Sequence, residues 1–274
     1  MNNIFILSHF HKDFIFNEKC DWIIPACSGD SILVNDSRYL NVCADGILDD
    51  YKKYYSEQTL FQYYRALGAE ASVLWLLKNI DRLNNKYFGF SSYRRYLYFF
   101  EDSNAEKILV NTNKDVVDSL TSDSAKENAE KILETYDIVL CRERTVEDNL
   151  SIENQYLRYQ LREMWDLFKT AIVELYPKYA NKIHWFSTTQ KCSFESPIIA
   201  KKEIFKELAL EYFSILEYVW QNCSDNYPDK SSKYIDCREE YPWRYPGFLG
   251  ERFFPFFAYA NDLNKKEVPL VLLQ

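Results

Sequence analysis

The sequence predicts an α/β domain whose helices gather toward the C-terminus. Short apolar runs bounded by polar residues, such as NIFILS at 3–8 and DIVLC at 137–141, are typical of buried strands. Between them lie tracts whose apolar residues recur at three- and four-residue steps, most clearly at 56–80 and 201–221. Alternation of strands and helices favours an α/β sheet over an all-helical or all-strand fold.

The remaining elements are predicted from the same patterns. Further strands are expected at 21–26, at 87–91 and in the apolar tail 268–274. Further helices are expected at 129–136, at 155–175 with Pro177 just beyond the end, and at 251–260 with Pro255 near the start. Irregular backbone is expected at 45–56, 101–128 and 241–250, and 182–199 mixes strand and loop signals.

Composition narrows the class of protein. The formal net charge of the 274-residue chain is −8, which disfavours bulk binding to nucleic-acid phosphates. The seven cysteines are irregularly spaced without a C-x-x-C pair, a pattern that fits reduced thiols better than a zinc site or a disulfide framework. The N-terminus lacks the features of a secretory signal, and no apolar run approaches a membrane span. We expect a cytoplasmic protein, at most peripheral to the inner face of the membrane.

The block YFGFSSYRRY (87–96) places two arginines directly after a predicted strand. In α/β folds, ligands bind beyond the carboxyl ends of strands. Arg94 and Arg95 could pair there with a diphosphate through charge-assisted hydrogen bonds. The alternative is a solvated pair of surface arginines.

The block YPWRYPGFLGER (241–252) is rich in turn residues and aromatics. Glu251 is a candidate general base, able to remove a proton from an acceptor hydroxyl. Arg244 and Arg252 are candidates for holding phosphate, and Trp243 and Tyr245 for stacking on a sugar. The alternative is a surface turn in which Glu251 caps the following helix.

Two further positions are candidates for the site. Ser8 and His9 end the first predicted strand, where a nucleotide commonly binds, although most single histidines are structural or exposed. Glu70 lies among small and apolar neighbours in the predicted helix 56–80, where burial without a partner is costly. Glu70 therefore either pairs with an arginine of the block 87–96, contacts substrate, or occupies an exposed helix face.

The sequence also lacks several nucleotide-binding motifs. No convincing Asp-x-Asp metal motif follows a strand, so no metal ligands are assigned and the need for a divalent metal stays open. Arginines and a tyrosine could neutralise a leaving diphosphate instead. There is no P-loop, no G-x-G-x-x-G and no G-x-S-x-G.

Six blocks in order resemble a family of glycosyltransferases, with an uncharacterised domain, encoded in capsular-polysaccharide and O-antigen gene clusters. The matching segments are Ser8-His9, GAEASVLWLLKN, YFGFSSYRRYLYF, DIVLCRER, SPIIAKKEIF and GFLGERFF, and they span nearly the whole chain. The departures are Ser92 in place of a His before Tyr-Arg-Arg, Ser196 and Pro197 in place of Asn-Met, and Ala71 in place of a Leu.

The resemblance implies a GT-A-like domain over residues 1–274, with a nucleotide-sugar part at 1–145 and a mainly helical acceptor-side part at 146–274. It implies a hexosyltransferase that moves a sugar, such as galactose or galactofuranose, from a UDP-sugar to a capsular or lipopolysaccharide glycan or a lipid-linked glycan. With Glu251 as the base, the transfer would be an inverting displacement. Tyr93 would then join Arg94 and Arg95 at the diphosphate, and Glu70 would be a second catalytic carboxylate.

Two other functions stay open at this stage. The departures at Ser92 and Ser196 favour, as the main alternative, a non-catalytic protein of a polysaccharide-assembly complex that keeps the glycosyltransferase fold. A nucleotide-dependent phosphohydrolase ranks lower, because the chain has no metal-ligand motif.

Overall fold

The computed structural model describes residues 2–28, 33, 35–42, 67–100, 105–194, 197–223 and 244–274. Its strands are β1 Ile4–His9, β2 Ile23–Cys27, β3 Leu40–Asn41, β4 Tyr87–Ser92, β5 Arg95–Leu97, β6 Lys107–Val110, β7 Ile138–Cys141, β8 Arg144–Thr145, β9 Lys191–Cys192, β10 Ile198–Lys201, β11 Lys265–Val268 and β12 Leu270–Leu273. Its α-helices are α2 Glu70–Asn79, α3 Lys114–Leu120, α4 Asp123–Thr135, α5 Ile152–Tyr159, α6 Arg162–Leu175, α7 Trp185–Thr188, α8 Lys202–Asn222 and α9 Tyr245–Ala260.

A mixed sheet forms the centre of the molecule. Its main path runs β11-β7-β10-β4-β1-β2-β3. Strand β5 pairs with β4 and also with β12, and β12 pairs with β6. Strand β1 pairs in parallel with both β2 and β4, with His9 opposite Ser92. The carboxyl ends of these three strands therefore meet at one edge, where α/β folds place ligands.

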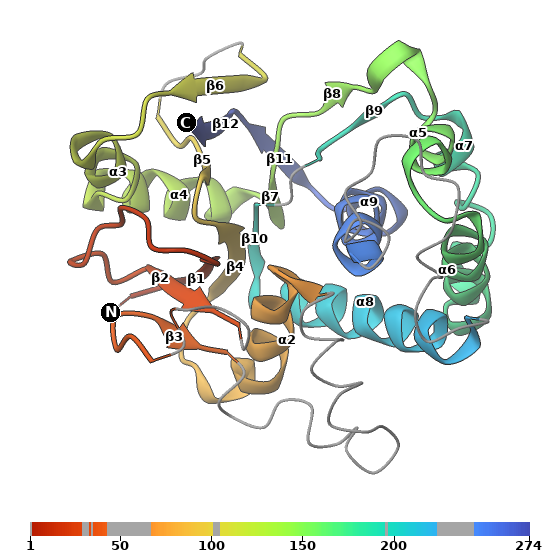
Figure 1. Ribbon diagram of the computed structural model, residues 1–274, viewed down its shortest axis with the longest axis horizontal. Coiled ribbons are helices and arrows are strands. Elements are labelled where there is room, and N and C mark those ends of the chain that lie inside the picture. Colours follow the sequence, from red (N-terminus) through yellow and green to blue (C-terminus); the bar gives the residue numbers. More distant parts are fainter. Residues whose placement is uncertain are drawn as a thin grey trace.

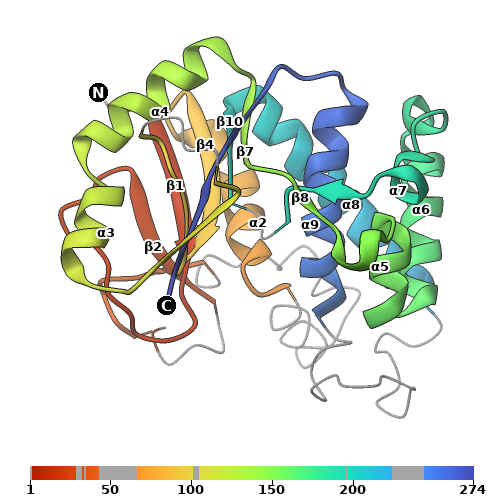
Figure 2. The same ribbon diagram turned by 90° about the horizontal axis from the view of Figure 1, so that it is seen from above.

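Helices cover both faces of the sheet. Figure 2 shows α3 and α4 on one side and α9, with α5, α6 and α7 beyond it, on the other. Figure 1 shows the N-terminal strands and helices α5 to α7 at opposite ends of the molecule. Successive strand residues enter different cores: Ile6 packs in the core beneath α4, whereas Leu7 packs in the larger core that holds α2, α8 and α9. This alternation is what the two-residue period of a strand requires.

The structure confirms the α/β class and most predicted elements. The predicted strands at 3–8, 21–26, 87–91, 137–141 and 268–274 correspond to β1, β2, β4, β7 and β12, and the predicted helix 201–221 corresponds to α8. The described part of the predicted helix 56–80 contains α2, whereas residues 56–66 and the predicted loop 45–56 lie outside the described residues. No helix in the described ranges is both long and apolar enough to cross a membrane.

The prediction of local structure for residues 101–128 was wrong. The segment 101–128 was expected to be irregular, but it holds β6, α3 and the start of α4. Asn113 caps α3 by accepting a hydrogen bond from the Val116 amide, and Ser122 caps α4 by accepting from the Ala125 amide. Such side-chain caps stabilise helix starts by about 1 kcal/mol each, so a segment of polar composition can still form helices.

The predicted helix 155–175 is two helices rather than one. The chain is extended at Gln160 and Leu161, between α5 and α6. The break lets Trp165 stack on Tyr156 with ring centroids 4.7 Å apart and donate a hydrogen bond from Nε1 to Glu153. Tertiary packing, rather than a Gly or Pro, therefore ends α5.

The predicted boundary between residues 145 and 146 does not divide the sheet into two. Strands β10, β11 and β12 come from the C-terminal part, and β10 lies between β4 and β7 of the N-terminal part. The two parts thus share one sheet, and helices α5 to α9 come from residues 146–274.

Candidate functional site

A pocket opens at the carboxyl ends of β1 and β4, between the sheet and helices α2 and α9. Glutamates and arginines from three segments meet there, although these segments are far apart in the sequence. The lining residues are Ala69, Glu70, Phe90, Ser91, Ser92, Arg95, Arg244, Gly247, Phe248 and Glu251.

Helix α9 supplies one wall of this pocket. Arg244, Gly247 and Glu251 are three and four residues apart, so they lie on one face of the helix. The expectation of an irregular 241–250 was therefore wrong for residues 245–250, and Glu251 does not cap a following helix but lies in the middle of α9. Pro255 has no amide hydrogen, so it leaves the Glu251 carbonyl without its usual helical donor.

Glu70 supplies the opposite wall from the first turn of α2. Its side chain is only 5% exposed. The pKa of Glu70 is raised from 4.5 to about 7. Burial is the largest cause and the charge of Glu251 adds to it, while the residue's own backbone amide, Arg244 and Arg95 oppose the rise. Near neutral pH, Glu70 is therefore half protonated beside a second carboxylate, an arrangement that can exchange a proton with a bound ligand.

The raised pKa of Glu70 predicts a pH-dependent stability. The folded chain holds the Glu70 proton more tightly than the unfolded chain, so its contribution is complete below about pH 4.5 and is lost as the pH rises through 7. From pH 5 to pH 8, wild type should lose roughly 1–3 kcal/mol of unfolding free energy relative to Glu70→Gln. Denaturant unfolding of both proteins at several pH values measures this difference, and parallel pH profiles would contradict it.

Gly247 lets α9 approach the Glu70 carboxylate. A Cβ at position 247 would lie 3.2 Å from Glu70 Oε2, closer than ordinary contact. Gly247→Ala should move that carboxylate by a few tenths of an ångström. Any reaction in which Glu70 takes part should then slow about tenfold. The melting temperature should hold or rise, because alanine favours a helix over glycine by about 1 kcal/mol. Assaying activity and melting on one preparation separates the two effects, and unchanged activity would contradict the prediction.

His9 and Ser8 face opposite sides of the sheet. His9 lies on the α2 and α9 side, and its Nδ1 has no hydrogen-bond partner among the described residues. Burial, with smaller contributions from the charges of His11 and Arg244, lowers the pKa of His9 to about 3, so the ring is neutral. Ser8 is buried toward the α4 side, as alternation along β1 requires, and it is not among the residues that line the pocket.

The two adjacent arginines after β4 take different positions. Arg95 starts β5 and lines the pocket, where its charge acts on Glu70. Arg94 is exposed, and its guanidinium lies over the ring of Tyr93 at 5.2 Å from the centroid. Tyr93 itself is buried and packs against Phe10 and Phe14. The tight turn between β4 and β5 separates the pair that the sequence presents as one motif.

Arg252 does not line the pocket. It is 3% exposed, donates to the Phe248 carbonyl at 2.6 Å and to Gln155, and packs over the ring of Tyr156. Its Nη1 lies 3.5 Å from Glu251 Oε2. Arg252 therefore supports the position of Glu251 from within the core, and the predicted phosphate contact has no support from its geometry.

Sequence patterns missed several residues at this edge of the sheet. Gly68 has a φ of +57°, a backbone conformation that favours glycine, and a Cβ there would lie in ordinary contact with Arg244 Nη2 at 3.6 Å. His11 and Lys12 also lie here, and the only sequence signal for them is that they follow His9. Trp243 and Ser196 lie outside the described residues. Within the described chain, no three His, Cys, Asp or Glu side chains group as metal ligands.

Comparison with known proteins places the chain in a family. No curated protein matches it. The chain is similar to the apo structure of the WbbM bifunctional glycosyltransferase, with a TM-score of 0.73 and 18% identity over 100% of this chain and 46% of that one. It thus spans about half of that protein's length and shares its fold. The profile described as "Domain of unknown function (DUF4422)" matches residues 62–262, which include Glu70, Arg95, Arg244 and Glu251. The chain therefore belongs to the DUF4422 family.

Proposed function

We propose that this protein is a glycosyltransferase that moves a sugar from a nucleotide-diphosphate donor to a glycan acceptor. The observation that carries the proposal is the pocket in which Glu70 and Glu251 face Arg95 and Arg244 at the carboxyl ends of β1 and β4. Carboxylates suit proton transfer from an acceptor hydroxyl, and arginines suit the negative charge of a leaving diphosphate. The fold shared with a solved glycosyltransferase supports the same class of reaction.

In this proposal, Glu251 is the general base. Its carboxylate takes the proton of an acceptor hydroxyl while the hydroxyl oxygen attacks the anomeric carbon of the donor sugar. The bond from that carbon to the diphosphate oxygen breaks, and the departing electron pair stays on the diphosphate, beside Arg95 and Arg244. A single displacement of this kind inverts the anomeric configuration. Glu70, held half protonated by burial, is placed to hydrogen-bond a sugar hydroxyl.

The finer assignments rest on the sequence resemblance. It supports a UDP-sugar donor, with galactose or galactofuranose as the transferred sugar, and a capsular, lipopolysaccharide or lipid-linked glycan as acceptor. Such an acceptor would call for a cytoplasmic enzyme working at the inner membrane face. His9 is the strand-end residue best placed to contact the donor, since its ring nitrogen is buried on the pocket side without a described partner.

A donor screen tests the proposal. Thermal melting with UDP-, GDP- and CMP-sugars, each with and without a divalent cation, should show stabilisation by one nucleotide class, since a ligand that binds only the folded state raises the melting temperature. Release of nucleoside diphosphate from that donor should fall about 10²-fold or more in Arg95→Ala. If no nucleotide sugar stabilises the chain and none is turned over, the non-catalytic alternative replaces this proposal.

A further inference from the structure

A cluster of basic side chains lies beside the pocket, around the ring of Tyr93. Lys12 Nζ lies 5.9 Å from the ring centroid and the Arg94 guanidinium carbon lies 5.2 Å from it. The His11 ring meets the same ring edge-on at 4.8 Å, with its Nε2 3.4 Å from the Tyr93 hydroxyl. We call His11, Lys12 and Arg94 the basic rim.

The rim is built on a rigid support. The Tyr93 side chain is 5% exposed and packs edge-on against Phe14 at 5.0 Å and tilted against Phe10 at 5.7 Å. Its backbone amide donates to the His9 carbonyl at 3.0 Å, which ties the turn after β4 to the end of β1. Two cations from segments some 80 residues apart are thus held against one fixed ring.

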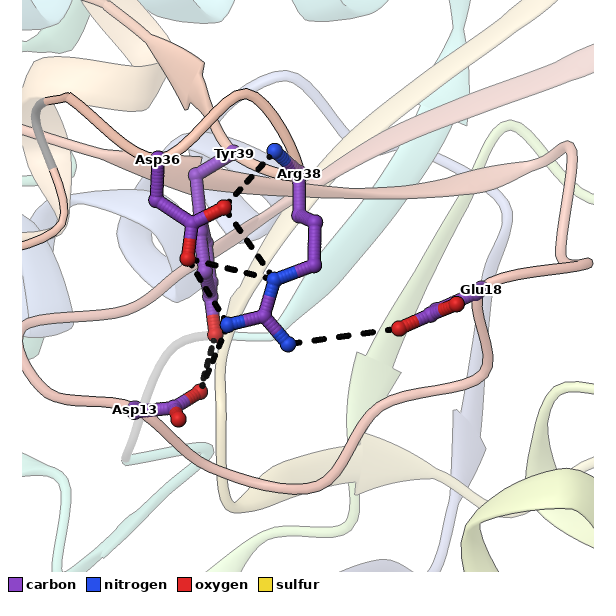
Figure 3. Close-up of polar contacts among 5 residues, drawn as sticks. All are labelled: Asp13, Glu18, Asp36, Arg38 and Tyr39. Carbon is purple, nitrogen blue, oxygen red and sulfur yellow. Dashed lines mark hydrogen bonds and ion pairs between the residues drawn. The ribbon is translucent and has the colours of Figure 1, made fainter.

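The charges of Lys12 and Arg94 are not neutralised in the described part of the chain. No carboxylate among the described residues lies within 4 Å of either one, although the chain as a whole carries a net charge of −8. Nearby Arg38 shows the opposite arrangement in Figure 3: its guanidinium contacts Asp36 at 2.7 Å, Asp13 at 3.5 Å and Glu18 at 3.9 Å. Arg38 is therefore paired with carboxylates, whereas Lys12 and Arg94 leave two positive charges beside the Tyr93 ring that a bound anion would offset.

We propose that the basic rim is an anion subsite that binds the diphosphate of a nucleoside diphosphate. Arg94 offers a planar fork for phosphate oxygens, and Lys12 offers a compact point charge. This deepens the proposed function and rests on it: the diphosphate spans the β4–β5 turn, with its leaving oxygen beside Arg95 and Arg244 and its nucleoside end on the Tyr93 side. The sugar lies against Glu70 and Glu251. This assigns Lys12 to donor binding, although Lys12 lies outside the sequence block 87–96 that contains Arg94.

Titration calorimetry with UDP, inorganic pyrophosphate, inorganic phosphate and uridine tests the subsite. Lys12→Gln and Arg94→Gln should each weaken UDP and pyrophosphate binding about tenfold, and neither should change uridine binding. Raising the salt concentration should weaken UDP binding less in the double variant than in wild type, because fewer charges take part. The matched control is Lys266→Gln, since Lys266 lies 6.0 Å over the ring of Tyr136, outside the pocket and the rim.

The outcomes separate this inference from the proposed function. Unchanged UDP and pyrophosphate affinities in Lys12→Gln and Arg94→Gln overturn the subsite, while nucleotide-sugar turnover by the same variants upholds the glycosyltransferase. Pyrophosphate binding that depends on both rim residues, in a chain that binds no nucleotide, upholds an anion site and overturns the donor assignment. Binding of inorganic phosphate as tightly as pyrophosphate would identify a phosphate-monoester site and overturn the diphosphate assignment.

Discussion

Replacing Glu251 by glutamine is expected to slow sugar transfer by about 10²–10⁴-fold, because the amide cannot accept the acceptor proton. Glutamine keeps the size of the side chain, so the donor should bind about as tightly as in wild type. The loss should therefore appear in kcat rather than in the donor KM, as expected for an interaction made only in the transition state. Steady-state kinetics with the donor found by melting measures both constants.

Two comparisons make the Glu251 result interpretable. Thermal melting of Glu251→Gln checks that losing the 3.5 Å contact with Arg252 leaves the fold intact. Glu207→Gln is a matched control. Glu207 lies on helix α8, outside the pocket, and its carboxylate pairs with Lys178 at 3.0 Å, so the variant also removes one glutamate charge. A wild-type kcat in Glu251→Gln would remove Glu251 from the role of base, and Glu70→Gln would then be the next variant to assay.

Gly89→Ala is expected to have the largest effect on stability. A Cβ at this position in β4 would lie 2.3 Å from the Ile198 carbonyl oxygen and 3.1 Å from the Ile199 Cα, both on the neighbouring strand β10. Backbone atoms in a central sheet cannot move aside cheaply, so strands β4 and β10 would have to separate. We expect a loss of about 3 kcal/mol or more in the free energy of unfolding. For a chain of this size, that corresponds to a fall of roughly 6–12 °C in melting temperature.

The stability prediction has an internal control. Gly247→Ala makes the same chemical change in helix α9, where the nearest atom belongs to the Glu70 side chain, and its melting temperature should not fall. Chemical denaturation and thermal melting of both variants give the comparison. The prediction would be contradicted if Gly89→Ala melted within 2 °C of wild type, which corresponds to a loss of about 1 kcal/mol or less for a chain of this size. Strands β4 and β10 would then separate more easily than their register indicates.

The separation of Arg94 from Arg95 shows why part of the site could not be predicted. The sequence correctly placed both arginines after a strand, because an apolar run followed by polar residues marks a strand end. Whether two successive side chains share a ligand depends on the turn that follows, here a tight β4–β5 connection with Ser92 opposite Arg95. The reassignment of Arg252 has the same origin, since burial against Tyr156 depends on how α9 packs on α5.

The sequence by itself determined the α/β class, the strands β1, β2, β4, β7 and β12, helix α8 and four residues that meet in the pocket: Glu70, Arg95, Arg244 and Glu251. These follow from local periodicity and from residue types suited to proton transfer and phosphate charge. Only the tertiary structure decided that β10 to β12 complete the sheet, that burial raises the pKa of Glu70, and that Lys12 joins Arg94 over Tyr93. Each of these depends on contacts between segments far apart in the chain, and such contacts leave no periodic signal in the sequence.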